Sequence, residues 1–149
     1  METTTSADIP TGERVATVAR ALTAASVLLS AVVHLELWAL GMKDVDIIGP
    51  AFLLNAVGGL AIALAVLLWR HRLPLLGAIG FGAATLAAFV MSMTVGLFGV
   101  REQVWGVSQV LSAVSEVAAI VFSLVALVAE RQRSAPASAG RAAAQASTT

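Results

Sequence analysis

Four long apolar segments, separated by short polar stretches, dominate the pattern of residues along the chain. In lipid every backbone polar group must be hydrogen-bonded within the chain, and a helix needs about 20 apolar residues to cross the hydrocarbon core. The pattern therefore predicts four membrane-spanning helices, at about 21–40, 51–69, 75–97 and 107–129. Pro50 and Pro74 stand just before the second and third segments, and proline is favoured in the first turn of a helix. We expect an all-α fold, a four-helix transmembrane bundle.

The two ends of the chain show no apolar periodicity. Residues 1–13 and 131–149 are rich in Ser, Thr, Ala and Pro, a composition that buries too little apolar surface to fold. We expect both to be disordered tails around a transmembrane domain at 14–130. The start of the fourth span stays open between Val104 and Val110, because the apolar pattern begins gradually there.

Lysine and arginine are unequally divided between the two sides of such a bundle. Seven lie on the side of the termini and two on the other, namely Arg14, Arg20, Arg70, Arg72, Arg131, Arg133 and Arg141 against Lys43 and Arg101. Cytoplasmic loops carry the excess of Lys and Arg. The bias predicts an antiparallel up-down-up-down bundle with both termini in the cytoplasm. His71, between two of these arginines, is expected to contact lipid headgroups at the inner surface.

Composition narrows the class of protein further. The chain of 149 residues is 58% hydrophobic and 12% charged, whereas soluble domains carry about 25% charged residues. We expect a multi-pass protein of the plasma membrane whose main partner is the lipid bilayer. The formal net charge of +0 gives no reason to expect a nucleic-acid partner. The absence of cysteine excludes disulfides and cysteine-ligated metal centres.

Small residues recur at a spacing of four along each span, which favours close helix packing in lipid. The third span carries the longest such stripe, formed by Gly80, Ala84, Ala88, Ser92 and Gly96. Shorter stripes, which include polar residues, are Ala51, Asn55, Gly59 and Ala63 in the second span, Ser26, Ser30 and His34 in the first, and Ser108, Ser112 and Glu116 in the fourth, where Ser123 follows one turn on after Ala119. We expect these faces to point at one another, and such faces would also suit a homo-oligomer or docking onto a larger membrane complex.

Three ionisable residues, His34, Glu36 and Glu116, fall within the predicted spans. A charge at the bilayer centre costs roughly 2.5–3.5 kcal/mol on insertion scales, so each is a candidate for a functional site. His34 and Glu36 are two positions apart and cannot share a helix face, so we expect His34 to point inward and Glu36 sideways. The sequence predicts an outer polar layer whose candidate ligand or proton site comprises His34, Asn55, Ser92, Ser112 and Glu116, with Gln109 nearby.

The chemistry of this layer stays open. Glu116 is protonated, paired with His34, or in contact with water, and a structural pair and a functional site are both consistent with the pattern. His34 can equally be a neutral imidazole bonded to a serine or a backbone carbonyl. We expect no catalytic residue, metal site or cofactor. In particular, a two-histidine haem site is excluded within one chain, because His34 and His71 lie on opposite sides of the membrane.

The chain resembles a group of uncharacterised small four-span integral membrane proteins of actinobacteria. The resemblance covers the spans and rests on His34-Leu35 with Leu37-Trp38, Ile47–Pro50 followed by Phe52–Asn55, Gly96–Gly99 before Glu102, and Glu116–Ala119. It implies the four-span fold and no particular activity. The chain is less similar to small multidrug exporters, whose essential glutamate lies in the first span.

Two functions follow from these observations as expectations. The first is an accessory or interaction component of a membrane complex, without catalytic activity of its own. The alternative is a carrier or ligand-binding bundle that moves protons or holds a small molecule at the outer polar layer around His34 and Glu116. A haem or quinone protein is a third, weaker reading.

Overall fold

The structure is a computed structural model that describes the backbone of residues 11–94, 96 and 106–146, with side chains up to residue 133. These residues form the helices α1 (Thr11–Ala39), α2 (Ile48–Leu68), α3 (Leu73–Thr94) and α4 (Val107–Ala146), with a 3-10 turn η1 (Met42–Asp44) between α1 and α2. Each of the four helices contains a stretch long and apolar enough to cross a membrane. No strand occurs in this part of the chain. The predicted all-α fold with four potential spans is therefore confirmed.

α2, α3 and α4 begin within three residues of the predicted starts, whereas α1 begins at Thr11, ten residues before the predicted start of the first span at 21. Pro50 is the third residue of α2 and Pro74 the second of α3, so both prolines occupy first turns, as predicted. The third span ends at Thr94, before the predicted residue 97. Gly96 explains the difference. Its φ of 86° leaves the helical region, and its N–H donates to the carbonyl of Met91 (2.9 Å), which closes the helix end.

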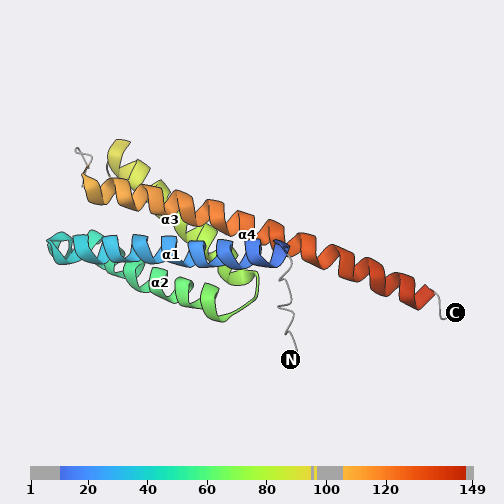
Figure 1. Cartoon of the computed structure of the whole chain (residues 1–149). Helices are drawn as coiled ribbons and strands as arrows, with labels where there is room; N and C mark the ends of the chain where they lie inside the picture. Colours follow the sequence, from blue (N-terminus) through green and yellow to red (C-terminus); the bar gives the residue numbers. More distant parts are fainter. Residues whose placement is uncertain (1–10, 95, 97–105, 147–149) are drawn as a thin grey trace, which may run out of the picture.

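Both tails are shorter than predicted. α1 begins at Thr11 rather than 14, and α4 continues as a helix to Ala146, so the expectation of a disordered segment from 131 onward is wrong for 131–146. The segment is rich in alanine, the residue with the highest helix propensity, and it continues a helix that is already nucleated. In Figure 1 this part of α4 extends past the other three helices. Residues 1–10 and 147–149 lie outside the described residues.

α1 lies between α2 and α4, and α3 packs mainly against α4 (Figure 1). Small side chains dominate the buried core, which consists of Ala19, Ala24, Val27, Ala63, Val66, Leu75, Ala78, Ala119, Ala126 and Leu127. Such side chains let helix backbones approach closely, which is how helices associate in lipid. Large apolar side chains face outward instead, for example Leu54 (73% exposed) and Leu68 (74% exposed). Small side chains inside and large apolar side chains on the surface suit a protein that is surrounded by lipid.

Two glycines mark close contacts between helices. A Cβ on Gly59 of α2 would lie 2.9 Å from the Cβ of Ala31 of α1, and one on Gly82 of α3 would lie 2.9 Å from the backbone oxygen of Glu116 of α4. Neither position accepts a larger residue without a shift of a helix. Gly59 belongs to the stripe expected in the second span, whereas Gly82 was not anticipated.

The long stripe of the third span does not form the packing face that we expected. α3 instead buries Leu75, Ala78 and Gly82, which repeat at the helical spacing of three and four on another face. Gly80 of the stripe has open space around it. Ala84, Ala88 and Ser92 border a cavity. Because α3 packs through its other face, the polar end of the stripe lines that cavity.

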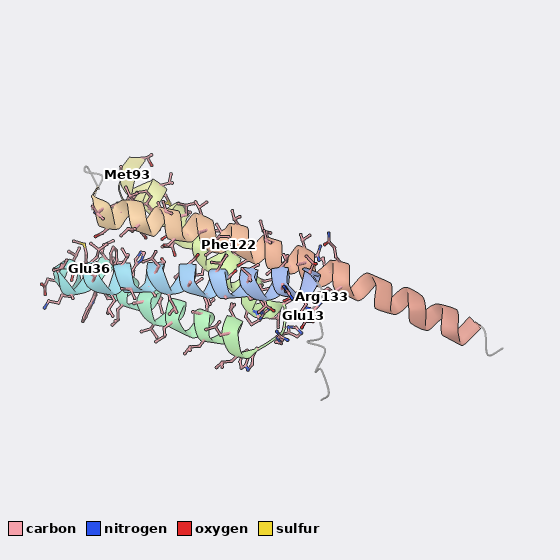
Figure 2. The ribbon with its side chains drawn as sticks, viewed as in Figure 1. Glu13, Glu36, Met93, Phe122 and Arg133 are labelled. Atoms are coloured by element: carbon pink, nitrogen blue, oxygen red, sulfur yellow. The ribbon has the colours of Figure 1, made fainter. Side chains whose placement is uncertain are left out.

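Contacts between α1 and α4 run in opposite residue order. Arg20, Thr23 and Ser30 of α1 meet Glu130, Ser123 and Glu116 of α4, respectively. Figure 2 shows the same order at one end of the pair, where Glu13 near the start of α1 lies beside Arg133 of α4, while Glu36 lies at the far end of α1.

Candidate functional site

Among the described ionisable side chains, that of Glu116 is the most deeply buried, with 0% of its surface exposed. Its Oε1 accepts hydrogen bonds from the hydroxyl of Ser112 (2.8 Å) and from the hydroxyl of Ser30 of α1 (3.4 Å). Ser112 is placed to donate because residues four apart lie on one helix face. The second carboxyl oxygen, Oε2, is buried without a hydrogen-bond partner. The buried carboxyl group is thus only half satisfied.

His34 lies beside this carboxyl group and is linked to it through Ser30. The Nδ1–H of His34 donates to the backbone oxygen of Ser30 (2.8 Å), and in the neutral imidazole this leaves Nε2 as an acceptor. The ring packs against Phe52 of α2, with centroids 5.0 Å apart and planes at 52°. The prediction that His34 and Ser30 share an inward face is confirmed. No direct ion pair joins His34 and Glu116, both of which the structure describes, so of the states left open the direct pair is absent.

Asn55 of α2 supplies a second half-satisfied group. Its Nδ2 donates to the hydroxyl oxygen of Thr85 of α3 (2.9 Å), and that hydroxyl in turn donates to the backbone oxygen of Phe81 (2.9 Å). The amide oxygen Oδ1 is buried and has no hydrogen-bond partner. Thr85 was not anticipated from the sequence, although it lies at the same level of the bundle.

These groups border one cavity of about 450 Å³, which we call the Glu116 cavity. All five residues predicted to form the site line it, so the structure brings the predicted polar layer together. Its polar lining residues are His34, Asn55, Thr85, Ser92, Gln109, Ser112 and Glu116. The remaining lining residues are apolar and include Phe52, Phe81 and Phe89. The volume lies in the range of pockets that hold small molecules.

The Glu116 cavity opens between α2 and α3. These two helices diverge from their short connection (Figure 1), and the lining residues Ala51 and Leu54 of α2 and Ala84 of α3 are exposed. Exposed apolar side chains such as Leu54 (73% exposed) border the opening. A molecule would therefore enter from the apolar surroundings of the helices.

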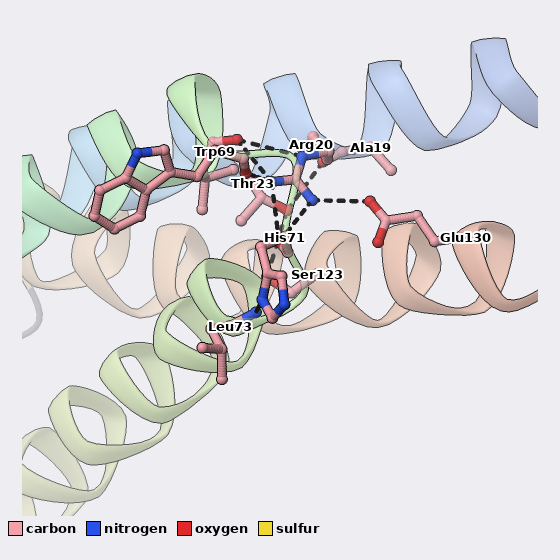
Figure 3. A network of polar contacts seen from close by, with 9 residues as sticks. Ala19, Arg20, Thr23, Trp69, His71, Leu73, Ser123 and Glu130 are labelled. Carbon is pink, nitrogen blue, oxygen red and sulfur yellow. Dashed lines mark hydrogen bonds and ion pairs between the residues drawn. The ribbon is translucent and has the colours of Figure 1, made fainter.

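A second polar centre lies at the other end of the bundle and is shown in Figure 3. Arg20 of α1, with a side chain 8% exposed, forms an ion pair with Glu130 of α4 (2.8 Å). Its guanidinium also donates to the backbone oxygens of Val66 (3.0 Å), Trp69 and His71 (3.3 Å). These oxygens lie at or just beyond the end of α2, where helix carbonyls lack intrahelical partners. Arg20 therefore ties three segments together.

This centre was not predicted, because the count of charges assigns Arg20 only to the side of the membrane before the first span. A signal was present, since Arg20 and Glu130 are opposite charges at the same predicted side of the first and fourth spans. Around them lies a cavity of about 610 Å³, the arginine cavity, lined by Ala16, Thr17, Arg20, Arg70, His71, Arg72, Glu130 and Arg133.

The ligands for a metal ion are not gathered at either centre. Among the described residues no group of three or more His, Cys, Asp or Glu side chains could hold a metal ion. The two histidines line different cavities, His34 the Glu116 cavity and His71 the arginine cavity. Comparison of the chain with protein-family models, curated proteins and solved structures finds no match.

Proposed function

We propose that this chain is a multi-pass protein of the plasma membrane that takes a small lipophilic molecule from the bilayer into the Glu116 cavity. One observation carries the proposal. Two buried acceptors without a hydrogen-bond donor, Glu116 Oε2 and Asn55 Oδ1, belong to residues that line an otherwise largely apolar cavity. An unsatisfied buried polar group costs about 1–3 kcal/mol, and a ligand that donates to it recovers that free energy.

The acceptors define the chemistry of the ligand. Glu116 Oε2, Asn55 Oδ1 and the Nε2 of His34 all accept hydrogen bonds in the state described above. A ligand that fits them carries N–H or O–H groups on an apolar body. A protonated amine fits best, because hydrogen bonds between an ammonium and a carboxylate are about twice as strong as neutral ones. The terminal torsion of a glutamate is broad, so the buried carboxyl group can turn Oε2 toward the cavity.

The same carboxyl oxygen can exchange a proton for the ligand. Oε1 is already occupied by two serine hydroxyls, so Oε2 is the position at which a proton or a ligand donor binds. The two therefore compete for one atom. His34 is the other titratable residue that lines the cavity, and its protonation would also repel an ammonium group. Such competition couples ligand release to proton uptake, as a carrier requires.

The orientation of the protein follows from charge. Seven of the nine Lys and Arg residues fall on the side of the termini, and the positive-inside rule assigns that side to the cytoplasm. The opposite residue order of α1 and α4 supports an antiparallel bundle. We propose an up-down-up-down topology in which both termini are cytoplasmic and the Glu116 cavity lies in the outer half of the membrane.

Binding of a defined amine tests the proposal. The probe is 1-naphthylmethylamine, titrated into the full chain in lipid nanodiscs, with 1-ethylnaphthalene as the probe of similar shape that lacks a donor. We expect saturable binding of the amine only. Glu116→Gln removes the charge-assisted bond, worth about 1.5–3 kcal/mol, and should weaken binding about 10- to 100-fold.

Glu36→Gln provides the matched control, because Glu36 is an exposed glutamate outside the cavity lining. It should bind the amine as the wild type does. Equal binding of both naphthalene probes, or equal loss in the two glutamine variants, would overturn the proposal.

The other expectations stay predictions. An accessory role in a larger membrane complex and a homo-oligomer are tested by the mass and composition of the particle purified in mild detergent. The resemblance to small four-span proteins of actinobacteria likewise stays a prediction. Neither is needed for the ligand site, which the four helices of one chain form.

A further inference from the structure

The arginine cavity carries a positive charge that its own acidic residues do not balance. Four arginines and one glutamate line it, and that glutamate, Glu130, is held by Arg20. Outside the lining, Glu13 pairs with Arg133 at 3.6 Å, where both side chains are partly exposed. The remaining positive charge of the lining comes from Arg70 and Arg72, which lie on the connection between α2 and α3.

Arg20 fixes the position of the connection that carries this charge. Its guanidinium donates to the backbone oxygens of Trp69 and His71, so it fixes the backbone on both sides of Arg70. The Nδ1 of His71 accepts from the backbone N–H of Leu73 (3.3 Å), which leaves its Nε2 as the donor. Arg70 and His71 thus present hydrogen-bond donors from a fixed connection, and Arg72 adds a further positive charge beside them.

The surroundings of the cavity select a lipid as the source of the anion. α2 ends at Leu68 and α3 begins at Leu73, so the connection lies where the apolar spans end. The apolar side chains next to it are strongly exposed, namely Leu68 (74%), Trp69 (68%) and Leu73 (66%). Indole rings favour the headgroup level of a membrane. A ligand with a phosphate and two acyl chains would cover both the charged cavity and the exposed apolar side chains next to it. Free phosphate would cover only the charged cavity.

We infer that the arginine cavity binds the phosphate group of an anionic phospholipid, with the acyl chains along the exposed leucines of α2 and α3. This site is separate from the Glu116 cavity and does not depend on the ligand proposed there. It would anchor the lipid next to the Arg20–Glu130 pair that holds the bundle together.

Lipid binding to the full chain in detergent, measured by native mass spectrometry, tests this inference. The probes are phosphatidylglycerol and phosphatidylcholine with the same acyl chains. We expect phosphatidylglycerol to bind at least tenfold more tightly. The triple variant Arg70→Gln/Arg72→Gln/Arg133→Gln should reduce that affinity by about 100-fold, because each basic residue near an anionic lipid surface contributes about fivefold in affinity.

Arg131→Gln is the matched control, since Arg131 is an exposed arginine of α4 that does not line the cavity. It should retain wild-type affinity for phosphatidylglycerol. The double variant Arg70→Gln/Arg72→Gln alters only exposed side chains, so it keeps the test valid if the triple variant does not fold.

Three results would overturn the inference. They are equal affinity for the two lipids, equal loss in the double variant and in Arg131→Gln, and full displacement of phosphatidylglycerol by millimolar inorganic phosphate. The last would assign the site to free phosphate. The double variant should bind 1-naphthylmethylamine as the wild type does. This measurement distinguishes a failure of the lipid site from a failure of the proposed function.

Discussion

Replacing Arg20 by methionine should destabilise the bundle more than removing any exposed arginine. The substitution keeps an unbranched side chain but breaks the 2.8 Å ion pair with Glu130 and removes the donors from the oxygens of Val66, Trp69 and His71. Breaking a buried pair by removing one partner costs about 3–5 kcal/mol. Glu130 is 17% exposed, so water can partly solvate it, and we expect a loss of about 3 kcal/mol.

The measurement is equilibrium unfolding by dodecyl sulfate in mixed micelles, followed by tryptophan fluorescence. Arg14→Met is the matched control, because Arg14 is an exposed arginine on the same helix and exposed ion pairs contribute only about 0–1 kcal/mol. The double variant Arg20→Met/Glu130→Gln should lose less than the sum of the single losses, by at least about 1 kcal/mol, because the two residues are in contact. Equal losses in Arg20→Met and Arg14→Met, or strict additivity in the double variant, would refute the assignment of Arg20 as the tie between three segments.

Three further predictions concern the Glu116 cavity and its walls. Gly82→Ala should lower the free energy of unfolding by about 1–3 kcal/mol in the same assay, because its methyl group would lie 2.9 Å from the backbone oxygen of Glu116. Gly80→Ala, with open space around it, should cause no loss. Equal effects of the two substitutions would contradict the packing described. Ser112→Ala should destabilise more than Ser30→Ala, because the hydroxyl of Ser112 lies 2.8 Å from Glu116 Oε1 and that of Ser30 lies 3.4 Å away; the reverse order would be contrary to this geometry. Binding of 1-naphthylmethylamine should weaken as the pH falls from about 8 to about 5, because protons compete for the carboxylate, and the dependence should be smaller in Glu116→Gln; an unchanged affinity across this range would exclude the competition.

The sequence predicted the number of helices well because the controlling physics is local. Each apolar segment is long enough to span a membrane by itself, and Pro50 and Pro74 stand in first turns irrespective of what packs against them. The helix ends were less predictable. The end of α3 depends on the φ of Gly96, and the extension of α4 to Ala146 depends on propagation from a helix already formed.

The candidate site was predictable to the extent that burial of a charge is costly. That cost singled out His34 and Glu116, and the shared helix face with Ser30 and Ser112 followed from helical periodicity. The pairing of these residues required tertiary information. Ser30 lies between the histidine and the carboxyl group, and no periodicity on one helix indicates which serine of another helix faces it.

The ion pair of Arg20 with Glu130 and the packing of α3 could not be predicted from the sequence, for related reasons. Counting charges assigns Arg20 to a side of the membrane but does not show that it reaches the end of α2. A stripe of small residues indicates that a face can pack closely, not that it does. Gly82 meets α4 while Gly80 does not, and which of the two does so depends on how α3 packs against α4.

The position of a bound amine tests the central claim most directly. A bromine-substituted 1-naphthylmethylamine, added to crystals of the full chain, marks its site by the anomalous signal of bromine. We predict a peak inside the cavity between α2 and α3, with the amine nitrogen at hydrogen-bond distance, about 2.7–3.2 Å, from Oε2 of Glu116. A peak confined to the outer surface of the helices, or none at a saturating concentration, would contradict the account.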